Sequence, residues 1–191
     1  MILKILSDII IVSDYLFLLH DNLSDKRISM ENSLYFEKLL KSFEHYYSIT
    51  QDDTVLPFDA HAEFVSKGEQ YILVKAAKIA QIDTNEFVYF KNVPSIDFSQ
   101  LQQLAEKAWD LGQSRIKPYY GHKNSDITLI VIADKLNDDV KKNIKKIKFS
   151  KSYKCGLYGW SNFKLAVKEL SSSDAWSNRL GSDMKKLLYK I

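Results

Sequence analysis

Three side chains that commonly bind metal ions or transfer protons stand at every second position of one short segment: Asp59, His61 and Glu63. The alanines between them make the segment alternate, and this alternation predicts a β-strand. Since successive side chains of a strand point to opposite faces, we expect the three on one face, with neighbours roughly 6–7 Å apart. Such a row could bind a divalent metal ion or relay a proton. It is also typical of an ordinary strand with one solvent-facing side.

An enzyme built on this strand would be a metal-dependent hydrolase or a nuclease of the PD-(D/E)xK kind. That nuclease needs an acidic residue on one strand and an acidic-x-Lys triplet on the next, to hold Mg²⁺. Asp59 and Glu63 could supply the first part, with Lys75 within reach, but Glu86-Phe87-Val88 does not supply the triplet. No further ligand is obvious, so no metal ion or other cofactor is assigned outside this alternative.

A second candidate for catalysis is His122, which follows Tyr119-Tyr120-Gly121 and precedes an apolar run. Loops at the ends of strands often carry functional residues, but a single loop histidine is more often structural or merely exposed. The sequence has no Gly-rich phosphate loop, no G-x-S-x-G, no H-E-x-x-H and no C-x-x-C. Whether the protein is an enzyme therefore stays open.

Charge is distributed unevenly along the 191 residues, whose formal net charge is only +3. Residues 1–100 carry 9 Lys/Arg against 15 Asp/Glu, whereas residues 101–191 carry 18 against 9. A helix is predicted to begin at Asn137, with Val140, Ile144 and Ile147 on its buried stripe. The lysines of this segment would then project outward together: Lys141, Lys142, Lys145, Lys146, Lys148, Lys151 and Lys154.

Two aromatic residues, Phe149 and Tyr153, interleave with the last of these lysines. Cations beside aromatic rings suit a phosphate backbone with exposed bases. Only two arginines, Arg115 and Arg179, lie in the same half, so bidentate contacts to bases are poorly provided for. We therefore expect sequence-independent contact with nucleic acid or another polyanion. The alternatives are a solvated helix face and, less favoured, an acidic membrane surface.

Composition favours an intracellular globular protein. With 46% hydrophobic residues, 6 Gly and 3 Pro, the chain is neither collagen-like nor of low complexity, and its one cysteine, Cys155, permits no internal disulfide. Residues 1–23 are largely apolar, but Lys4, Asp8 and Asp14 interrupt them, and no small-residue cleavage site follows. We expect a cytoplasmic protein without a membrane span.

The elements that must position these residues indicate an α+β fold with a mixed, mostly antiparallel sheet flanked by helices. Residues 1–50 are expected to form an N-terminal helical pair packed on an α/β core over residues 51–191, in a single domain overall. Asp97 and Gln100 predict a capping box, and Gly112 the end of that helix. Strands are predicted over 58–64, 71–74, 86–90, 127–133 (covered on both faces) and 162–168 (with one solvent face), and helices over 97–112, 137–148 and 184–191.

Several stretches stand out as a set: residues 71–79 (YILVKAAKI), His122, residues 149–160 (FSKSYKCGLYGW), and Asn178-x-x-Gly181. Over roughly residues 35–190 they resemble a family of uncharacterised proteins from low-GC Gram-positive bacteria. The resemblance implies a bacterial cytosolic origin and brings no activity with it.

The same stretches also have a structural interpretation. Gly156 and Gly159 predict a tight turn, because glycine adopts backbone conformations that other residues avoid. Trp160 is expected to pack across the sheet edge. Asn178 and Gly181 are expected to shape the beginning of the last helix.

Three functions remain open from the sequence. The first is a non-enzymatic module that binds an anionic partner through the lysine-rich helix, with nucleic acid favoured. The second is a metal-dependent hydrolase or nuclease-like enzyme that uses Asp59, His61 and Glu63. The third is a protein-interaction component, in which the acidic N-terminal half or the apolar first helix docks a protein partner or a second copy of the chain. The nuclease-like hypothesis requires the strand carboxylates and the lysines to border one cleft.

Overall fold

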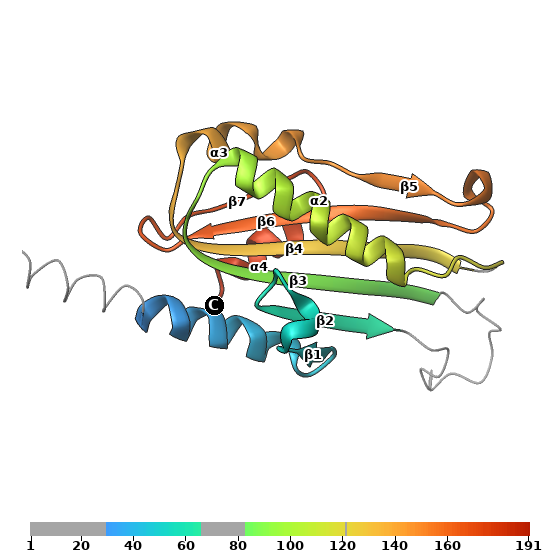
Figure 1. Ribbon diagram of the computed structural model, residues 1–191, viewed down its shortest axis with the longest axis horizontal. Helices are drawn as coiled ribbons and strands as arrows, with labels where there is room; N and C mark the ends of the chain where they lie inside the picture. Colours follow the sequence, from blue (N-terminus) through green and yellow to red (C-terminus); the bar gives the residue numbers. More distant parts are fainter. Residues whose placement is uncertain (1–29, 66–82, 121) are drawn as a thin grey trace, which may run out of the picture.

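A seven-stranded mixed sheet forms the centre of the molecule (Figure 1). The structure is a computed structural model, and it describes residues 30–65, 83–120 and 122–191. The strand order is β1-β2-β3-β4-β6-β5, and β7 pairs with the later part of β6. The strands are β1 (Ser48–Thr50), β2 (Ala60–Val65), β3 (Asp83–Ile96), β4 (His122–Leu136), β5 (Ser150–Ser152), β6 (Trp160–Glu169) and β7 (Ala175–Ser177).

The three long strands β3, β4 and β6 run parallel, and the outer strand pairs are antiparallel. Helix α2 (Phe98–Arg115) connects β3 to β4, because parallel neighbours need a long crossover. The predicted α+β class and mixed sheet are thus confirmed. The register places Glu86 opposite Asp126 and Thr128 opposite Lys164, so charged side chains of three central strands come close together.

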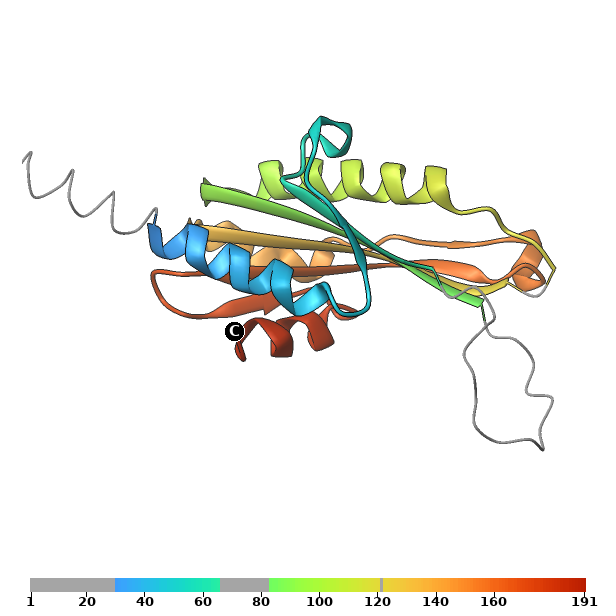
Figure 2. The same ribbon diagram turned by 90° about the horizontal axis from the view of Figure 1, so that it is seen from below.

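Helices cover both faces of the sheet (Figure 2). On one face α2 packs with α3 (Asp138–Asn143) and the short 3-10 helix η2 (Ile144–Lys146). On the other lie the helix over residues 30–43 and α4 (Ser182–Leu188), which are joined by a hydrogen bond from the Tyr35 hydroxyl to the Leu188 carbonyl (2.6 Å). Two further 3-10 helices are η1 (Asp53–Val55) and η3 (Lys154–Gly156).

Some of the predicted elements and residues lie outside the described residues. This applies to the first helix of the N-terminal pair, to the strand expected over 71–74 and to Lys75. The second helix of the pair is present over residues 30–43. Among the described helices, none combines the length and the apolar character needed to cross a membrane.

The start of α2 was predicted correctly from neighbouring residues, but its end was not. The Asp97 carboxylate accepts from the Gln100 backbone N–H (2.8 Å), and the Gln100 side chain accepts from the Asp97 N–H (3.0 Å), so the capping box is confirmed. The prediction that Gly112 ends the helix is wrong. Gly112 lies inside α2 and is buried against β4, where a Cβ would lie 2.6 Å from Ile127 Cγ1.

One side chain completes the outer edge of β6. β5 pairs with residues 160–162 and β7 with residues 166–168, which leaves a gap between them. Asn178 fills this gap: its Oδ1 accepts from the Leu165 N–H (3.1 Å) and its Nδ2 donates to the Phe163 carbonyl (3.0 Å). Its Oδ1 also accepts from the N–H of Gly181, the N-cap of α4, as expected for a residue that shapes this turn.

The expected solvent face of β6 is present only in the first half of the strand. There Asn162 and Lys164 are half-buried, and Trp160, which was expected to pack across the sheet edge, is 49% exposed. Farther along the same face, Lys168 is buried beneath α4 and the helix over residues 30–43. Its Nζ lies 5.7 Å from the Tyr35 ring and 5.1 Å from the Tyr189 ring.

Candidate functional site

The structure does not gather Asp59, His61 and Glu63 into one site. The Asp59 carboxylate accepts from Lys91 Nζ (2.8 Å) and from a backbone N–H of β3 (2.6 Å). Glu63 Oε2 lies 3.0 Å from Arg115 Nη1. Each carboxylate is thus neutralised by its own cation. Within the described parts of the chain, no three His, Cys, Asp or Glu side chains are placed to hold a metal ion.

His61 belongs to the core rather than to a solvent-facing strand surface. It is 2% exposed, and its ring centroid lies 4.8 Å from that of Tyr89 and 6.3 Å from that of Phe87. Burial, together with the nearby Arg115 guanidinium, lowers the pKa of His61 to about 4. The imidazole is therefore uncharged at neutral pH.

This buried imidazole predicts a pH-dependent stability. Because the pKa of His61 falls from 6.5 in the unfolded chain to about 4 in the folded one, protons bind the unfolded state more tightly. The free energy of unfolding therefore has its full value above pH 6.5. It decreases by about 3 kcal/mol as the pH falls toward 4, because the unfolded chain takes up a proton at His61 that the folded chain does not. We expect His61→Phe to remove this dependence, measured as the free energy of unfolding in urea across that range.

The matched control for this prediction is His45→Asn, at an exposed position just after the helix over residues 30–43. It should leave the pH dependence of the wild-type protein unchanged. Parallel stability curves for wild type and His61→Phe would contradict the assignment.

His122 is a structural residue at the beginning of β4 and does not stand in a loop. It is buried, and its Nδ1 lies 2.8 Å from the Tyr158 carbonyl oxygen while Nε2 lies 2.9 Å from Ser125 Oγ. Because a carbonyl only accepts, Nδ1 is the donor of the first bond. The Nδ1 bond fastens the beginning of β4 to the turn before β6, and the Nε2 contact is made within β4.

Six of the seven predicted lysines form an exposed surface along one edge of the sheet. We call this surface the basic edge: Lys142, Lys145, Lys146, Lys148, Lys151 and Lys154. Within the described chain none of the six has an ion-pair partner. The predicted anchor is confirmed, since Val140, Ile144 and Ile147 are all buried.

The prediction that one helix carries these lysines is wrong. Helix α3 ends at Asn143, and the later lysines follow on η2, β5, η3 and the connecting backbone. Lys141 is set apart, because its Nζ lies 2.9 Å from the buried Glu169 carboxylate and 5.0 Å from the centre of the Trp176 ring. Burial alone would raise the pKa of Glu169, but its bonds from Ser172, a backbone N–H and Lys141 outweigh burial and lower that pKa.

The two aromatic residues among these lysines are partly buried and packed against the core. Phe149 packs inward, with its ring centroid 5.7 Å from that of Trp109 and 5.1 Å from that of Phe163. The Tyr153 hydroxyl is hydrogen bonded to Gln113 on α2 (2.9 Å). The lysine cations are therefore more exposed than these two rings.

The strand carboxylates and the basic edge lie on opposite sides of the sheet. β2 is separated from β5 by β3, β4 and β6 in the strand order, and Figure 1 shows the two at opposite edges. They do not border one cleft, so the geometry does not support the nuclease-like hypothesis.

A charged cluster that was not predicted lies on the face covered by α4. Glu86 on β3, Asp126 on β4 and Lys164 on β6 point to this face because each is in phase with buried residues of the same cluster. Lys164 Nζ lies 2.9 Å from Asp126 Oδ2, 3.3 Å from Asp183 Oδ2 and 3.8 Å from Glu86 Oε1. Only the register of these three strands, which are far apart along the chain, brings the charges together.

Neighbouring groups hold these charges in place. The Tyr47 hydroxyl donates to Glu86 Oε2 (2.6 Å), and Asn124 Nδ2 donates to Asp126 Oδ1 (2.9 Å). Burial by itself lowers the pKa of Lys164, but the hydrogen bond to Asp126 and the charges of the three carboxylates outweigh it, so the pKa lies above its ordinary value. Burial and the bond to Glu86 raise the pKa of Tyr47, which stays a neutral donor.

A cavity of 420 Å³ opens beside this cluster. We call it the β3–β4 cavity: its lining consists of Tyr46, Tyr47, Phe64, Asn85, Glu86, Asn124 and Asp126. Aromatic rings, carboxylates and amides thus face one space of the size that small-molecule sites have.

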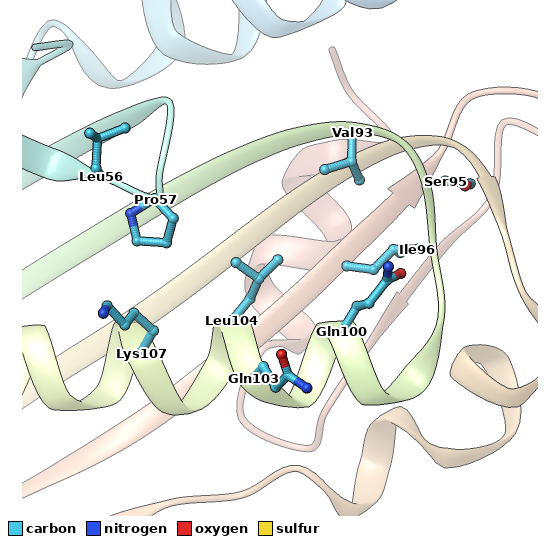
Figure 3. Close-up of a pocket in the computed structure, with 9 residues that line it drawn as sticks. All are labelled: Leu56, Pro57, Val93, Ser95, Ile96, Gln100, Gln103, Leu104 and Lys107. Carbon is cyan, nitrogen blue, oxygen red and sulfur yellow. The ribbon is translucent and has the colours of Figure 1, made fainter. Parts of the chain in front are cut away.

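A larger cavity of 620 Å³ lies on the opposite face, between α2, the end of β3 and the segment after η1 (Figure 3). Leu56, Pro57, Val93, Ile96 and Leu104 make its lining largely apolar, and Lys107 is the single charged residue among the lining residues. It offers no pair of groups for acid–base or metal chemistry.

Comparisons with known proteins identify one similarity. A family model described as Domain of unknown function (DUF8052) matches residues 31–190. Neither a curated protein nor a solved structure matches the chain.

Proposed function

Since the chain belongs to the family of the domain of unknown function DUF8052, which brings no activity with it, we propose a function from the surface of the molecule itself. The protein is a non-enzymatic module that binds the phosphate backbone of nucleic acid along its basic edge. In this proposal it meets its partner in the bacterial cytoplasm.

The observation that supports the proposal is the set of six exposed lysines within residues 142–154, none of which has an ion-pair partner among the residues that the structure describes. Val140, Ile144 and Ile147 fasten this segment to the core, so the ammonium groups are held on one side of the molecule. A row of cations attracts a phosphate backbone and releases its condensed counterions, which supplies most of the affinity of sequence-independent binding.

Lysine chemistry also defines the mode of binding. An ammonium group is a point charge and lacks the planar fork with which arginine reads guanine or grips a phosphate. Phe149 and Tyr153 are half-buried and bonded or packed within the fold, so in this proposal they do not supply base stacking. Contact with phosphates rather than with bases follows, and affinity should be independent of sequence.

The test replaces four lysines of the basic edge by glutamine: Lys142, Lys145, Lys146 and Lys148. Binding of a short fluorescent DNA duplex of mixed sequence is measured by anisotropy at low salt. We expect the affinity to fall at least about 30-fold, because four phosphate contacts are lost.

The matched control replaces four exposed lysines elsewhere by glutamine: Lys38, Lys41, Lys107 and Lys186. Both variants lose four positive charges, so overall charge is held equal and only position differs. The control should weaken binding less than about threefold. Equal loss in the two variants, or no binding by wild type, would overturn the proposal.

A further inference from the structure

The β3–β4 cavity is lined by two kinds of side chain that attract cations. Glu86 and Asp126 present carboxylates from adjacent central strands, and Tyr46, Tyr47 and Phe64 present aromatic rings. The rings of Tyr47 and Phe64 lie side by side, with centroids 5.8 Å apart. Carboxylates attract a positive charge directly, and aromatic faces attract it through their quadrupole.

We infer that this cavity binds a small organic cation, of the alkylammonium type. The inference is independent of the proposed function, because the cavity and the basic edge share no residue.

The charged cluster beside the cavity is net negative, which favours the binding of a cation. Lys164 contributes one positive charge, against one negative charge each from Glu86, Asp126 and Asp183. The net formal charge of these four groups is therefore −2. An anionic ligand would be repelled here, since Glu86 and Asp126 line the cavity and Lys164 is not among its lining residues.

The carboxylates keep capacity to accept a further hydrogen bond. Glu86 accepts hydrogen bonds from Tyr47 and from Thr128 Oγ1 (3.3 Å), and it forms an ion pair with Lys164 at 3.8 Å. Asp126 accepts from Asn124 and from Lys164. A carboxylate offers about four lone-pair sites, so each can accept at least one more N–H donor from a ligand ammonium group.

Lys164 also shows which kind of cation suits the cluster. Its Nζ already lies within 2.9–3.8 Å of three carboxylates, the place where a metal ion would have to sit. A metal ion would therefore have to displace this ammonium group. An organic cation can instead occupy the cavity, with its charged end between the carboxylates of Glu86 and Asp126 and the faces of the aromatic rings.

The experiment titrates the 191-residue chain with butylammonium chloride and, separately, with butanol as the neutral analogue of the same shape. Binding is followed by isothermal titration calorimetry and by chemical-shift changes of the residues that line the cavity. We expect saturable binding of butylammonium and binding of butanol that is at least about tenfold weaker.

Three variants localise the binding. Glu86→Gln and Asp126→Asn preserve shape but remove one negative charge each, and either should weaken butylammonium binding at least about fivefold. Tyr46→Ala removes an aromatic wall whose side chain is largely exposed, so it leaves the buried cluster intact and keeps the test valid if a carboxylate variant unfolds. It should weaken binding about two- to fivefold.

Asp110→Asn serves as the control, because it removes one exposed carboxylate from α2 on the opposite face of the sheet. Its affinity for butylammonium should equal that of wild type. Absence of saturable binding, equal binding of butanol, or variants of the lining that all bind like Asp110→Asn would overturn the inference. The basic-edge variant should retain butylammonium binding, so the two proposals can fail separately.

Discussion

Replacing Asn178 with alanine is expected to lower the free energy of unfolding by about 3–5 kcal/mol. The Asn178 amide serves four buried backbone groups: it accepts from the N–H groups of Leu165 and Gly181 and donates to the carbonyls of Ile147 and Phe163. Alanine would leave them without these bonds in the gap between β5 and β7. Urea unfolding followed by circular dichroism measures the loss.

The matched control for Asn178 is Asn143→Ala at the end of α3, whose amide makes one exposed hydrogen bond to the Asp139 carbonyl. This change should cost less than about 1 kcal/mol. A loss for Asn178→Ala no larger than for Asn143→Ala would show that the side chain does not complete the sheet. Gly181 acts at the same place, since a Cβ there would lie 2.2 Å from the Leu165 carbonyl oxygen.

Replacing Lys164 with methionine is expected to destabilise the protein by about 3 kcal/mol at neutral pH. The side chain of Lys164 is only 17% exposed and neutralises Glu86 and Asp126, which face each other across β3 and β4. Methionine fills a similar volume but leaves two partly buried like charges together. Thermal and urea unfolding at several pH values measure the effect.

Two observations distinguish this electrostatic cost from simple loss of packing. The cost should shrink as the pH falls toward about 4, where carboxyl groups begin to bind protons. Adding Glu86→Gln to Lys164→Met should recover part of the lost stability, whereas Lys107→Met on the exposed side of α2 should cost little. A loss that does not change with pH would contradict the electrostatic interpretation.

Features that depend on a few neighbouring residues could be predicted from the sequence. The capping box of α2 needs only Asp97 and Gln100, and the burial of β4 on both faces follows from its continuous apolar run. The inward anchor of Val140, Ile144 and Ile147 is also correct, although the helix ends at Asn143. Apolar residues at these spacings can face the core from α-helical, 3-10 or extended backbone, so the spacing did not fix the helix length.

Features that depend on what packs across a strand could not be predicted in the same way. The alternation around His61 indicates a strand but does not show that side chains from β3 and α2 cover its polar face. The cluster of Glu86, Asp126 and Lys164 requires the register of three strands that are far apart along the chain. No local pattern contains that register, so these residues were not candidates.

The predicted resemblance agrees with the family match in its extent, roughly residues 35–190 against residues 31–190. The bacterial origin and the protein-interaction hypothesis, with a protein partner or a homodimer, stay predictions. Among the candidate sites, the basic edge is exposed and has no ion-pair partner in the described part of the chain, whereas Asp59, His61, Glu63 and His122 are engaged within the fold.

The salt dependence of DNA binding tests the basic edge most directly. The logarithm of the affinity falls linearly with the logarithm of salt concentration, with a slope of about −0.9 per neutralised phosphate of duplex DNA. The variant that lacks Lys142, Lys145, Lys146 and Lys148 should therefore have a slope shallower by about 3 to 4 than that of wild type. The control variant, with glutamine at Lys38, Lys41, Lys107 and Lys186, should keep the slope of wild type. Equal slopes for the basic-edge variant and wild type would contradict the assignment of the basic-edge lysines to phosphate contacts.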